Sequence, residues 1–133
     1  MSYYDTLETR SPATREAALM AALAGQVAHA KAAAPYYAQT LAGVDAAACT
    51  SRAALAALPL TRKRDLIALQ KETPPFGGLN AVARDKAKRV FASPGPIYEL
   101  QGMEMDHWRM ARVLYAAGFR HGDLIHNCFS YHF

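Results

Sequence analysis

The stretch RVFASPGPIYELQG, residues 89–102, decides the fold expected for the second half of the chain. It begins with β-prone residues, turns at Pro94-Gly95-Pro96 and leads toward a segment with helical periodicity. A strand, a glycine turn and a helix together form the usual outline of a phosphate-binding loop. The turn has one glycine, and no Lys, Ser or Thr directly follows it. The outline therefore predicts a phosphate loop, while the residue types leave open a much altered loop or an ordinary turn.

The segments after this turn predict a helix and a second strand. Residues 103–118 have an amphipathic helical pattern, closed by Gly118 as a C-cap, and Trp108 is expected in the core. The expected buried stripe of this helix consists of Met110, Val113, Leu114 and Ala117. Residues 122–133 are rich in apolar and aromatic side chains and predict a strand. Strand, helix and strand indicate an α/β fold, and because two strands alone make no stable sheet, we expect the first unit of a larger domain.

The first half of the chain predicts helices. Ser11 followed by Pro12 is a helix start, because the hydroxyl caps the helix and proline suits its first position. Apolar residues then recur at helical spacing to about Ala33, and Pro35 ends the pattern. A short helical turn is expected over residues 35–43.

Two further short helices are expected over residues 49–71. The basic run at 62–64 opens the second of them and is interpreted as a solvated face. The chain is therefore expected to form one incomplete domain. Its helical N-terminal region covers 1–75, and the start of an α/β core covers 76–133.

Composition limits the class of protein. The chain has 133 residues, enough for one ordinary domain, and a net charge of +4 from 15 basic and 11 acidic residues. This mild excess suits an anionic ligand such as a nucleotide and lies below the charge density of nucleic-acid binders. Cys49 and Cys128 have no paired spacing and are interpreted as reduced thiols of the cytoplasm. No signal peptide and no membrane span are expected.

Six segments carry a resemblance to a known family. They are YYDTLETRSPATREA (3–17), HAKAAAPYYAQTLAGVD (29–45), LPLTRKRDL (58–66), PPFGG (74–78), FASPGPIYE (91–99) and AAGFRHGDLIHNCFSYHF (116–133). In this order and spacing they resemble the N-terminal part of the phenylacetate–CoA ligase family, within the adenylate-forming, AMP-binding acyl-CoA synthetases. Each segment alone is a weak signal, and the six together cover nearly the whole chain.

The resemblance implies a two-step ligase reaction. A carboxylic acid, phenylacetate-like in this family, reacts with ATP to give an acyl adenylate and pyrophosphate, and coenzyme A then displaces AMP. The implied cofactors are ATP, Mg²⁺ and coenzyme A, and the implied partners are small molecules, with no nucleic acid and no membrane. The catalytic residues of the family come later in the sequence than these 133 residues, so none is assigned here. An alternative is a non-catalytic helical interaction module or an inactive truncated fragment. Exposed strand edges would also favour a homo-oligomer.

The resemblance assigns a divergent phosphate loop to five residues. They are Ser93, Gly95, Ile97, Tyr98 and Glu99. Pro94 and Pro96 each lack an N–H that would face a phosphate. Glu99 stands near the position of the family's Lys, where a carboxylate repels a triphosphate unless Mg²⁺ lies between them. The resemblance thus predicts a loop in the family's place with altered chemistry.

The C-terminal residues have two interpretations. Tyr131, His132 and Phe133 would lie at the carboxyl end of the last strand, where open α/β sheets bind ligands, and by resemblance they help to wall an acyl pocket. Plain core packing explains them equally well. His126 and Cys128 would share one face of that strand, but they lack zinc-site spacing and are interpreted as ordinary strand residues, with no metal assigned.

A second basic run alternates along the chain at Arg84, Lys86 and Lys88. On an extended segment the three would share one face. They would then either attract the phosphates of ATP or coenzyme A, or form a solvated edge.

Overall fold

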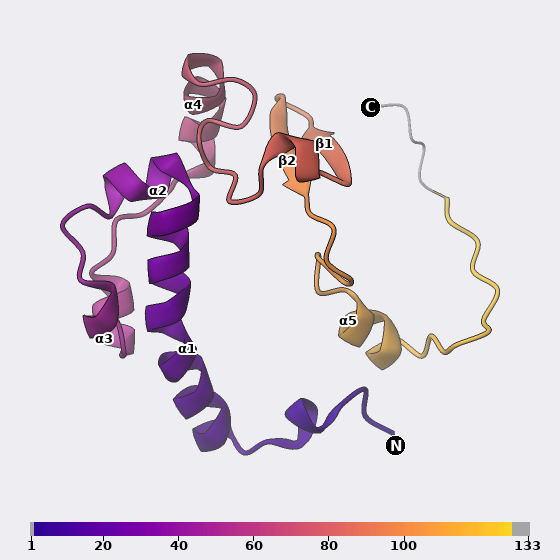
Figure 1. The fold of residues 1–133 in the computed structure, drawn as a ribbon. Coiled ribbons are helices and arrows are strands. Elements are labelled where there is room, and N and C mark those ends of the chain that lie inside the picture. The colour runs from indigo at the N-terminus through magenta and orange to yellow at the C-terminus, as the bar shows by residue number, and fades with distance from the viewer. Residues whose placement is uncertain (1, 129–133) are drawn as a thin grey trace.

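A computed structural model describes residues 2–128 of the chain (Figure 1). The helices are α1 (Pro12–Ala33), α2 (Pro35–Thr40), α3 (Arg52–Ala56), α4 (Leu66–Glu72) and α5 (Ala111–Ala116). The strands are β1 (Arg89–Ser93) and β2 (Ile97–Gln101), which pair antiparallel. Short 3-10 turns, such as Thr6–Thr9 before α1, link some of these elements.

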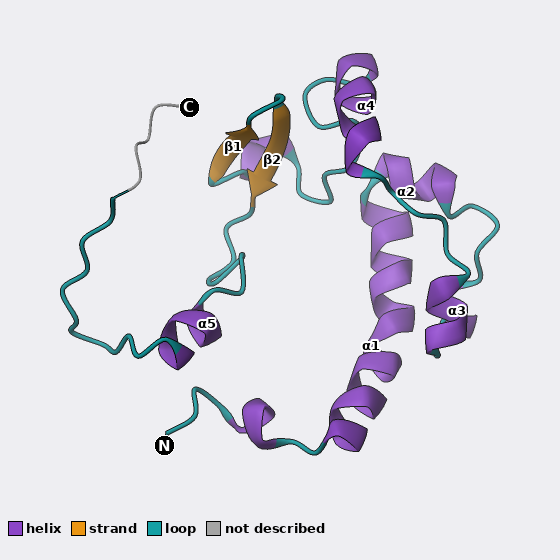
Figure 2. Ribbon diagram, turned by 180° about the vertical axis from the view of Figure 1, so that it is seen from behind, coloured by secondary structure: helices purple, strands orange, loops and turns teal. Residues whose placement is uncertain are grey.

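The elements follow an open arc (Figures 1 and 2). Helices α1, α2 and α3 form one side, α4 and the hairpin of β1 and β2 come next, and α5 follows. The N-terminal segment runs back from α1 toward α5, so that the two ends of the arc approach each other. Contacts between these ends are made by Asp5 and Arg112.

Helix α1 begins and ends where the sequence predicts. The Ser11 hydroxyl accepts a hydrogen bond from the Thr14 N–H at 3.1 Å, and Pro12 occupies the first helical position. The helix ends at Ala33, and α2 begins at Pro35 after the extended Ala34. The predicted helix from Pro12 to about Ala33 is confirmed.

A small apolar core joins α1 to the next elements. Val27, Leu41 and Cys49 are buried together, and the side chains that pack against them are Leu23, Tyr37, Val44, Ala46 and Leu58. On the outer side, Arg52 of α3 donates to both Glu16 carboxylate oxygens, at 2.6 and 2.7 Å. The hydrogen bond from Arg52 lowers the pKa of Glu16, and the same bond raises the pKa of Arg52.

A glycine turn after α4 returns the chain to the helical half. Gly77 and Gly78 have φ angles of +66° and +69°, a region that favours glycine. The Gly78 carbonyl accepts a hydrogen bond from the Tyr36 N–H at 3.0 Å. A Cβ at Gly77 would lie 3.1 Å from the main chain of Leu69, so this turn packs tightly on α4. The predicted Gly-Gly turn is confirmed.

The predicted α/β class with a helical first half is confirmed, and its individual elements differ from the sequence expectation. The residues after Pro96 form strand β2 instead of leading into a helix. The helix expected over 103–118 is shortened to α5, because Asp106 and Arg109 adopt φ angles of +53° and +57° before it. Residues 122–128 form no strand, and the remainder of that expected strand lies outside the described residues.

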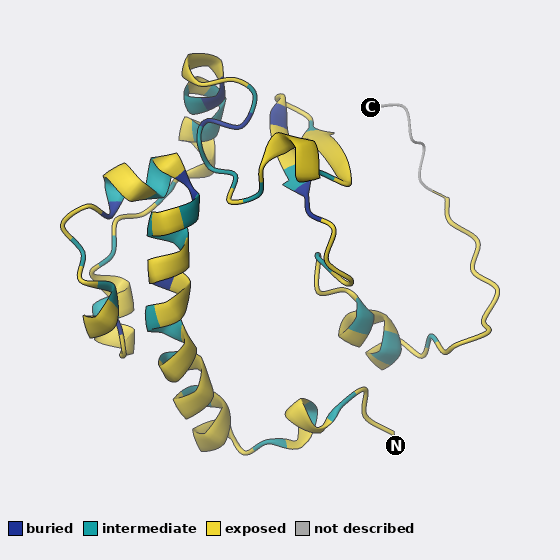
Figure 3. Ribbon diagram, in the orientation of Figure 1, coloured by how far each residue is buried: buried dark blue, intermediate teal, exposed yellow. Residues whose placement is uncertain are grey.

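Most of the described residues are exposed (Figure 3), and many large apolar side chains are among them. The expected stripe on α5 is not buried: Met110, Val113 and Leu114 are 47, 56 and 40% exposed, and Ala117 is exposed as well. Trp108 is 45% exposed, so its predicted core position is also wrong. The apolar stripe of α5 is exposed because no described element covers this face of the helix, whereas Trp108 is only partly covered, by the Phe91 ring of β1 and by His107. The basic run at 62–64 is exposed, as predicted.

No helix among residues 2–128 combines the length and the apolarity needed to cross a membrane.

Candidate functional site

The predicted phosphate-loop residues form a β-hairpin. Ser93 pairs with Ile97 at its tip, and the turn between them contains three residues. Gly95 adopts a φ of +122°, which explains the glycine at this position. The Ser93 hydroxyl donates to the Ile97 carbonyl at 3.4 Å and so helps to close the turn.

The hairpin tip fits a triphosphate poorly. Phosphate-binding loops present several backbone N–H groups to one anion. Here Gly95 supplies the only N–H of the turn, because Pro94 and Pro96 have none. Glu99 adds a carboxylate that makes no hydrogen bond or ion pair with residues 2–128. The turn is therefore structurally a hairpin loop with little capacity of its own to hold phosphates.

The hairpin is attached to α4 through Gln70. The Gln70 side-chain amide donates to the Tyr98 carbonyl at 2.9 Å, and its oxygen accepts from the Tyr98 N–H at 2.8 Å. The Gln70 side chain therefore replaces a neighbouring strand at this point of β2. Gln70 is 8% exposed, so both hydrogen bonds are shielded from water.

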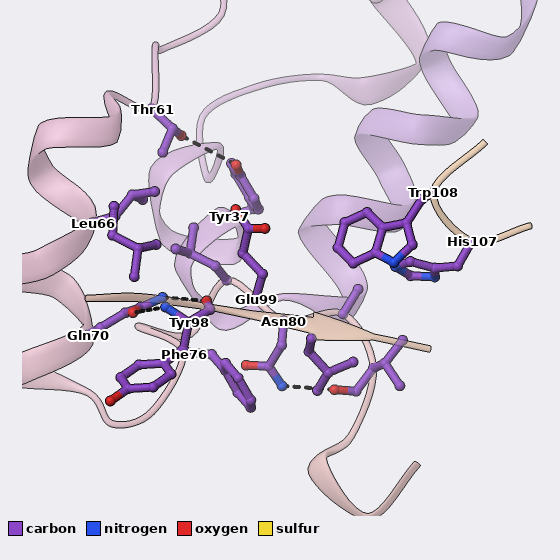
Figure 4. A pocket seen from close by; sticks show the side chains of 15 residues that line it. Tyr37, Thr61, Leu66, Gln70, Phe76, Asn80, Tyr98, Glu99, His107 and Trp108 are labelled. Carbon is purple, nitrogen blue, oxygen red and sulfur yellow. Dashed lines mark hydrogen bonds between the residues drawn. The ribbon is translucent and has the colours of Figure 1, made fainter. Parts of the chain in front are cut away.

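A cavity of about 450 Å³ lies between the helical half and the hairpin (Figure 4). Residues from α2, α4, the loop after the Gly-Gly turn, β2 and the segment before α5 line it. Its apolar and aromatic lining includes Tyr37, Leu66, Phe76, Leu79, Ile97 and Trp108. A cavity of this size and lining is typical of a site for a small, mostly apolar ligand.

Few polar groups face this cavity. The Thr61 hydroxyl donates to the Tyr37 hydroxyl at 3.4 Å, and the Asn80 amide donates to the Val82 carbonyl at 2.9 Å. Figure 4 shows these bonds together with the Gln70 pair. The carboxylate of Glu99 is the only acidic group among the lining residues. The cavity thus combines apolar walls with one negative charge.

Aromatic rings pack around Trp108 at one end of the cavity. The Phe91 ring of β1 meets the indole edge to face, with centroids 5.8 Å apart, and the His107 ring does so at 4.9 Å. His107 Nδ1 lies 3.3 Å from the Glu104 carboxylate. A backbone hydrogen bond at Glu104 and the contact with His107 lower the pKa of that carboxyl group. These contacts hold Trp108 against the hairpin although it is half exposed.

The structure divides the predicted hairpin residues into two groups. Ile97, Tyr98 and Glu99 line the cavity, and Ile97 is 4% exposed. Ser93 and Gly95 lie at the tip outside that lining. The predicted pocket residues Tyr131, His132 and Phe133 lie outside the described part of the chain.

The other polar candidates are dispersed. Arg84 and Lys86 lie in a 3-10 turn instead of an extended segment, so the expected alternation is wrong there, and Arg84, Lys86 and Lys88 are all exposed. His126 and Cys128 are exposed and not in a strand. Within residues 2–128, no three His, Cys, Asp or Glu side chains are placed to hold a metal ion.

The sequence did not predict the cavity, nor the role of Gln70 in attaching the hairpin to α4. Gln70 gave no signal, since a glutamine within a helix is usually a surface residue. Tyr37 and Trp108 were each part of a recognised helical pattern, and the sequence alone did not bring them to the same cavity.

Comparison with curated proteins gives one informative relative. A phenylacetate–coenzyme A ligase of Thermus thermophilus is 35% identical to the chain over 106 residues, which is 73% of this chain and 23% of the relative. No protein-family model matches the chain.

Comparison with solved structures also gives a CoA ligase. Two structures of 2-hydroxyisobutyryl-CoA ligase in the postadenylation state, with 2-HIB-AMP and with R3-HIB-AMP, are each 28% identical to the chain. The TM-scores are 0.73 and 0.75, over 84 and 86% of this chain. The chain spans about a quarter of the length of these relatives, at 23 to 26%.

Proposed function

We propose that this chain, which belongs to the phenylacetate–CoA ligase family and matches its N-terminal segment, supplies part of the acid-binding site of an acyl- or aryl-CoA ligase. The helical region at 1–75 forms one wall of this site, and the start of the α/β core at 76–133 forms the other. The cavity between them binds the apolar part of a carboxylic acid.

The observation that carries this function is the position of the cavity. It lies against β2, and it shares Ile97, Tyr98 and Glu99 with the stretch that resembles the family's phosphate loop. An acid whose apolar part fills the cavity has its carboxylate near the hairpin, where activation would take place. The aromatic lining around Phe76 and Trp108 suits an aryl acid such as phenylacetate, because aromatic rings pack favourably edge to face.

The binding of nucleotide and coenzyme A is assigned to the whole ligase. Glu99 is acidic and has no ion-pair partner among residues 2–128, so it fits a Mg²⁺-bound phosphate better than a bare one. The turn at 94–96 adds only one N–H, and most phosphate contacts are therefore assigned to the rest of the ligase. A location in the cytoplasm, where ATP and coenzyme A are made available to such ligases, belongs to the same proposal.

Trp108 provides the test, because it is the only tryptophan of the chain and lines the cavity. Phenylacetate and 2-hydroxyisobutyrate are titrated into the purified chain while tryptophan emission is recorded. Saturable quenching or a blue shift by one of the acids is expected, with a matching rise in the melting temperature.

A variant that fills the cavity supplies the control. Val82→Phe places a ring among the lining residues and should abolish the fluorescence change. Ala83→Phe, at an exposed neighbouring position outside the lining, should leave it intact. If both acids leave the emission of a folded chain unchanged, or if the two variants respond alike, acid binding in this cavity is wrong.

A second function, a non-catalytic interaction module, is favoured by the exposed apolar surface. Met105 and Leu124 are almost fully exposed, and Val113 is 56% exposed. Apolar patches of this kind mark surfaces that bind other proteins. The acid titration distinguishes the two functions, because a module would bind a second chain, as measured by sedimentation equilibrium, without responding to either acid.

A further inference from the structure

The N-terminal segment runs toward α5 (Figure 1), and side chains far apart in sequence hold the two together. Arg112 Nη2 donates to the Asp5 carboxylate at 2.5 Å, and Arg112 Nε lies 3.6 Å from a Glu8 carboxylate oxygen. The Tyr115 hydroxyl donates to the Ser2 hydroxyl at 2.8 Å. These contacts bring residues more than a hundred positions apart into one site.

Asp5 and Arg112 both carry their charges at neutral pH. The hydrogen bond from Arg112 lowers the pKa of Asp5, and the same bond raises the pKa of Arg112. The Glu8 carboxylate also accepts the Tyr4 N–H at 2.9 Å. Both carboxylates of the segment are therefore already occupied.

A hollow of about 740 Å³ lies between this segment, the start of α1 and α5. Four arginines line it, and we call it the arginine hollow: Arg10, Arg15, Arg112 and Arg120. Glu8 is the only acidic residue in the lining. With Asp5 included, the guanidinium groups outnumber the carboxylates by two, so the hollow has an uncompensated positive charge.

Three of these guanidinium groups form no ion pair with a carboxylate among residues 2–128. Arg10 Nε donates to the Leu7 carbonyl at 3.1 Å, and the Arg15 guanidinium makes no hydrogen bond or ion pair with residues 2–128. Arg120 Nη1 donates to two carbonyl groups, at 2.7 and 2.8 Å, and the guanidinium stacks on the Tyr115 ring at 3.7 Å. Each guanidinium has five N–H donors, so all three keep donors for a ligand. Backbone contacts and stacking also hold Arg10 and Arg120 in place.

We propose that the arginine hollow binds a phosphate dianion, either inorganic phosphate or the phosphomonoester of a nucleotide. Planar guanidinium groups bind phosphate through paired N–H donors, and several arranged around one hollow favour a doubly charged anion over a carboxylate. The hollow is separate from the cavity beside β2, since the two share no lining residue. Anion binding there does not depend on the acid-binding function proposed above.

Isothermal titration calorimetry of the whole chain at constant ionic strength tests this. The probes are inorganic phosphate, adenosine 3′,5′-bisphosphate and, as the arm without phosphate, adenosine. Saturable binding of one phosphate-bearing probe per chain and none of adenosine is expected. Equal affinity for the first two identifies the anion as free phosphate, and tighter binding of the bisphosphate identifies a nucleotide phosphomonoester.

Two matched variants test whether phosphate binds in the arginine hollow. Arg15→Gln removes a guanidinium that makes no hydrogen bond or ion pair within the described part of the chain, so the fold should persist, and the affinity for phosphate should fall about tenfold. Arg62→Gln removes the same charge from a position outside the hollow and should leave the affinity unchanged. No saturable phosphate binding by the unmodified chain, or an equal loss in both variants, would overturn the proposal.

Discussion

Gln70 holds the main chain of Tyr98 at two points, with hydrogen bonds of 2.9 and 2.8 Å between its side-chain amide and the Tyr98 carbonyl and N–H. This pair is the polar link between α4 and β2, and it sits beside the cavity that both elements line. A two-stranded hairpin is marginally stable by itself in water. The position of the hairpin, and with it the shape of the cavity, therefore depends strongly on the Gln70 side chain, together with the packing of Phe91 on Trp108.

Replacement of Gln70 should release the hairpin from α4. In Gln70→Ala, the Tyr98 N–H and carbonyl lose their buried partners, and the free energy of unfolding should fall by about 1–3 kcal/mol. Gln39→Ala, in α2, is the matched control and should change it little. Denaturant titration measures the loss, and hydrogen exchange of the Tyr98 amide locates it. Unchanged protection of that amide in Gln70→Ala would contradict the role given to this link.

Glu99 should limit the affinity of the hairpin for a nucleotide. In Glu99→Lys, a carboxylate that has no ion-pair partner within residues 2–128 becomes an ammonium group, so the affinity for ATP in the absence of Mg²⁺ should rise by about tenfold. Glu99→Gln removes the charge alone and should give a smaller rise. Microscale thermophoresis with and without Mg²⁺ measures both. If Glu99 binds through Mg²⁺, the outcome reverses, and Glu99→Lys weakens binding only when the ion is present.

Acid should destabilise the chain through two carboxylates. Hydrogen bonds from Arg112 and Arg52 lower the pKa values of Asp5 and Glu16 in the folded chain. A lowered folded-state pKa contributes stability above the unfolded value, near 4, and this contribution is lost as the pH falls through the folded value. The melting temperature should therefore drop progressively as the pH falls below about 5.

The double variant Asp5→Asn, Glu16→Gln tests this assignment. It removes two of the three carboxyl groups among residues 2–128 whose pKa is lowered, Glu104 being the third, so its melting temperature should fall less steeply over the same acidic range. At neutral pH its melting temperature should be lower than that of the parent. Circular dichroism melts at a series of pH values provide the comparison. Parallel curves for the parent and the double variant would show that other carboxylates cause the acid sensitivity.

The features that the sequence predicted are those fixed by local chemistry. Ser11 and Pro12 start α1 through a cap and a fixed φ angle, and Gly77 and Gly78 supply φ angles that other residues rarely adopt. These signals act within a few residues, so they are visible without any tertiary structure. The α/β class followed from the same kind of local pattern.

The features that could not be predicted from the sequence depend on tertiary packing. The helical pattern of 103–118 is genuine, but short helices need a packed face to be stable, and here only α5 forms. The Asp106 carboxylate accepts the Ala111 N–H at 2.9 Å and so starts α5 late. The contact between Gln70 and Tyr98 spans 28 positions, and no local pattern in the sequence encodes it.

The exposed hairpin should make the chain self-associate. β1 pairs only with β2 among the described strands, so its other edge is open, and Val90 and Phe91 on it are 53 and 43% exposed. Open apolar edges pair with other chains, and a charged side chain on the edge prevents this. Sedimentation velocity should show association that rises with concentration, and Val90→Lys should reduce it. Leu19→Lys, at a comparably exposed position on α1, is the control for added charge alone and should leave association unchanged. A monomeric parent chain, or equal effects of the two lysines, would show that the hairpin edge is not the contact.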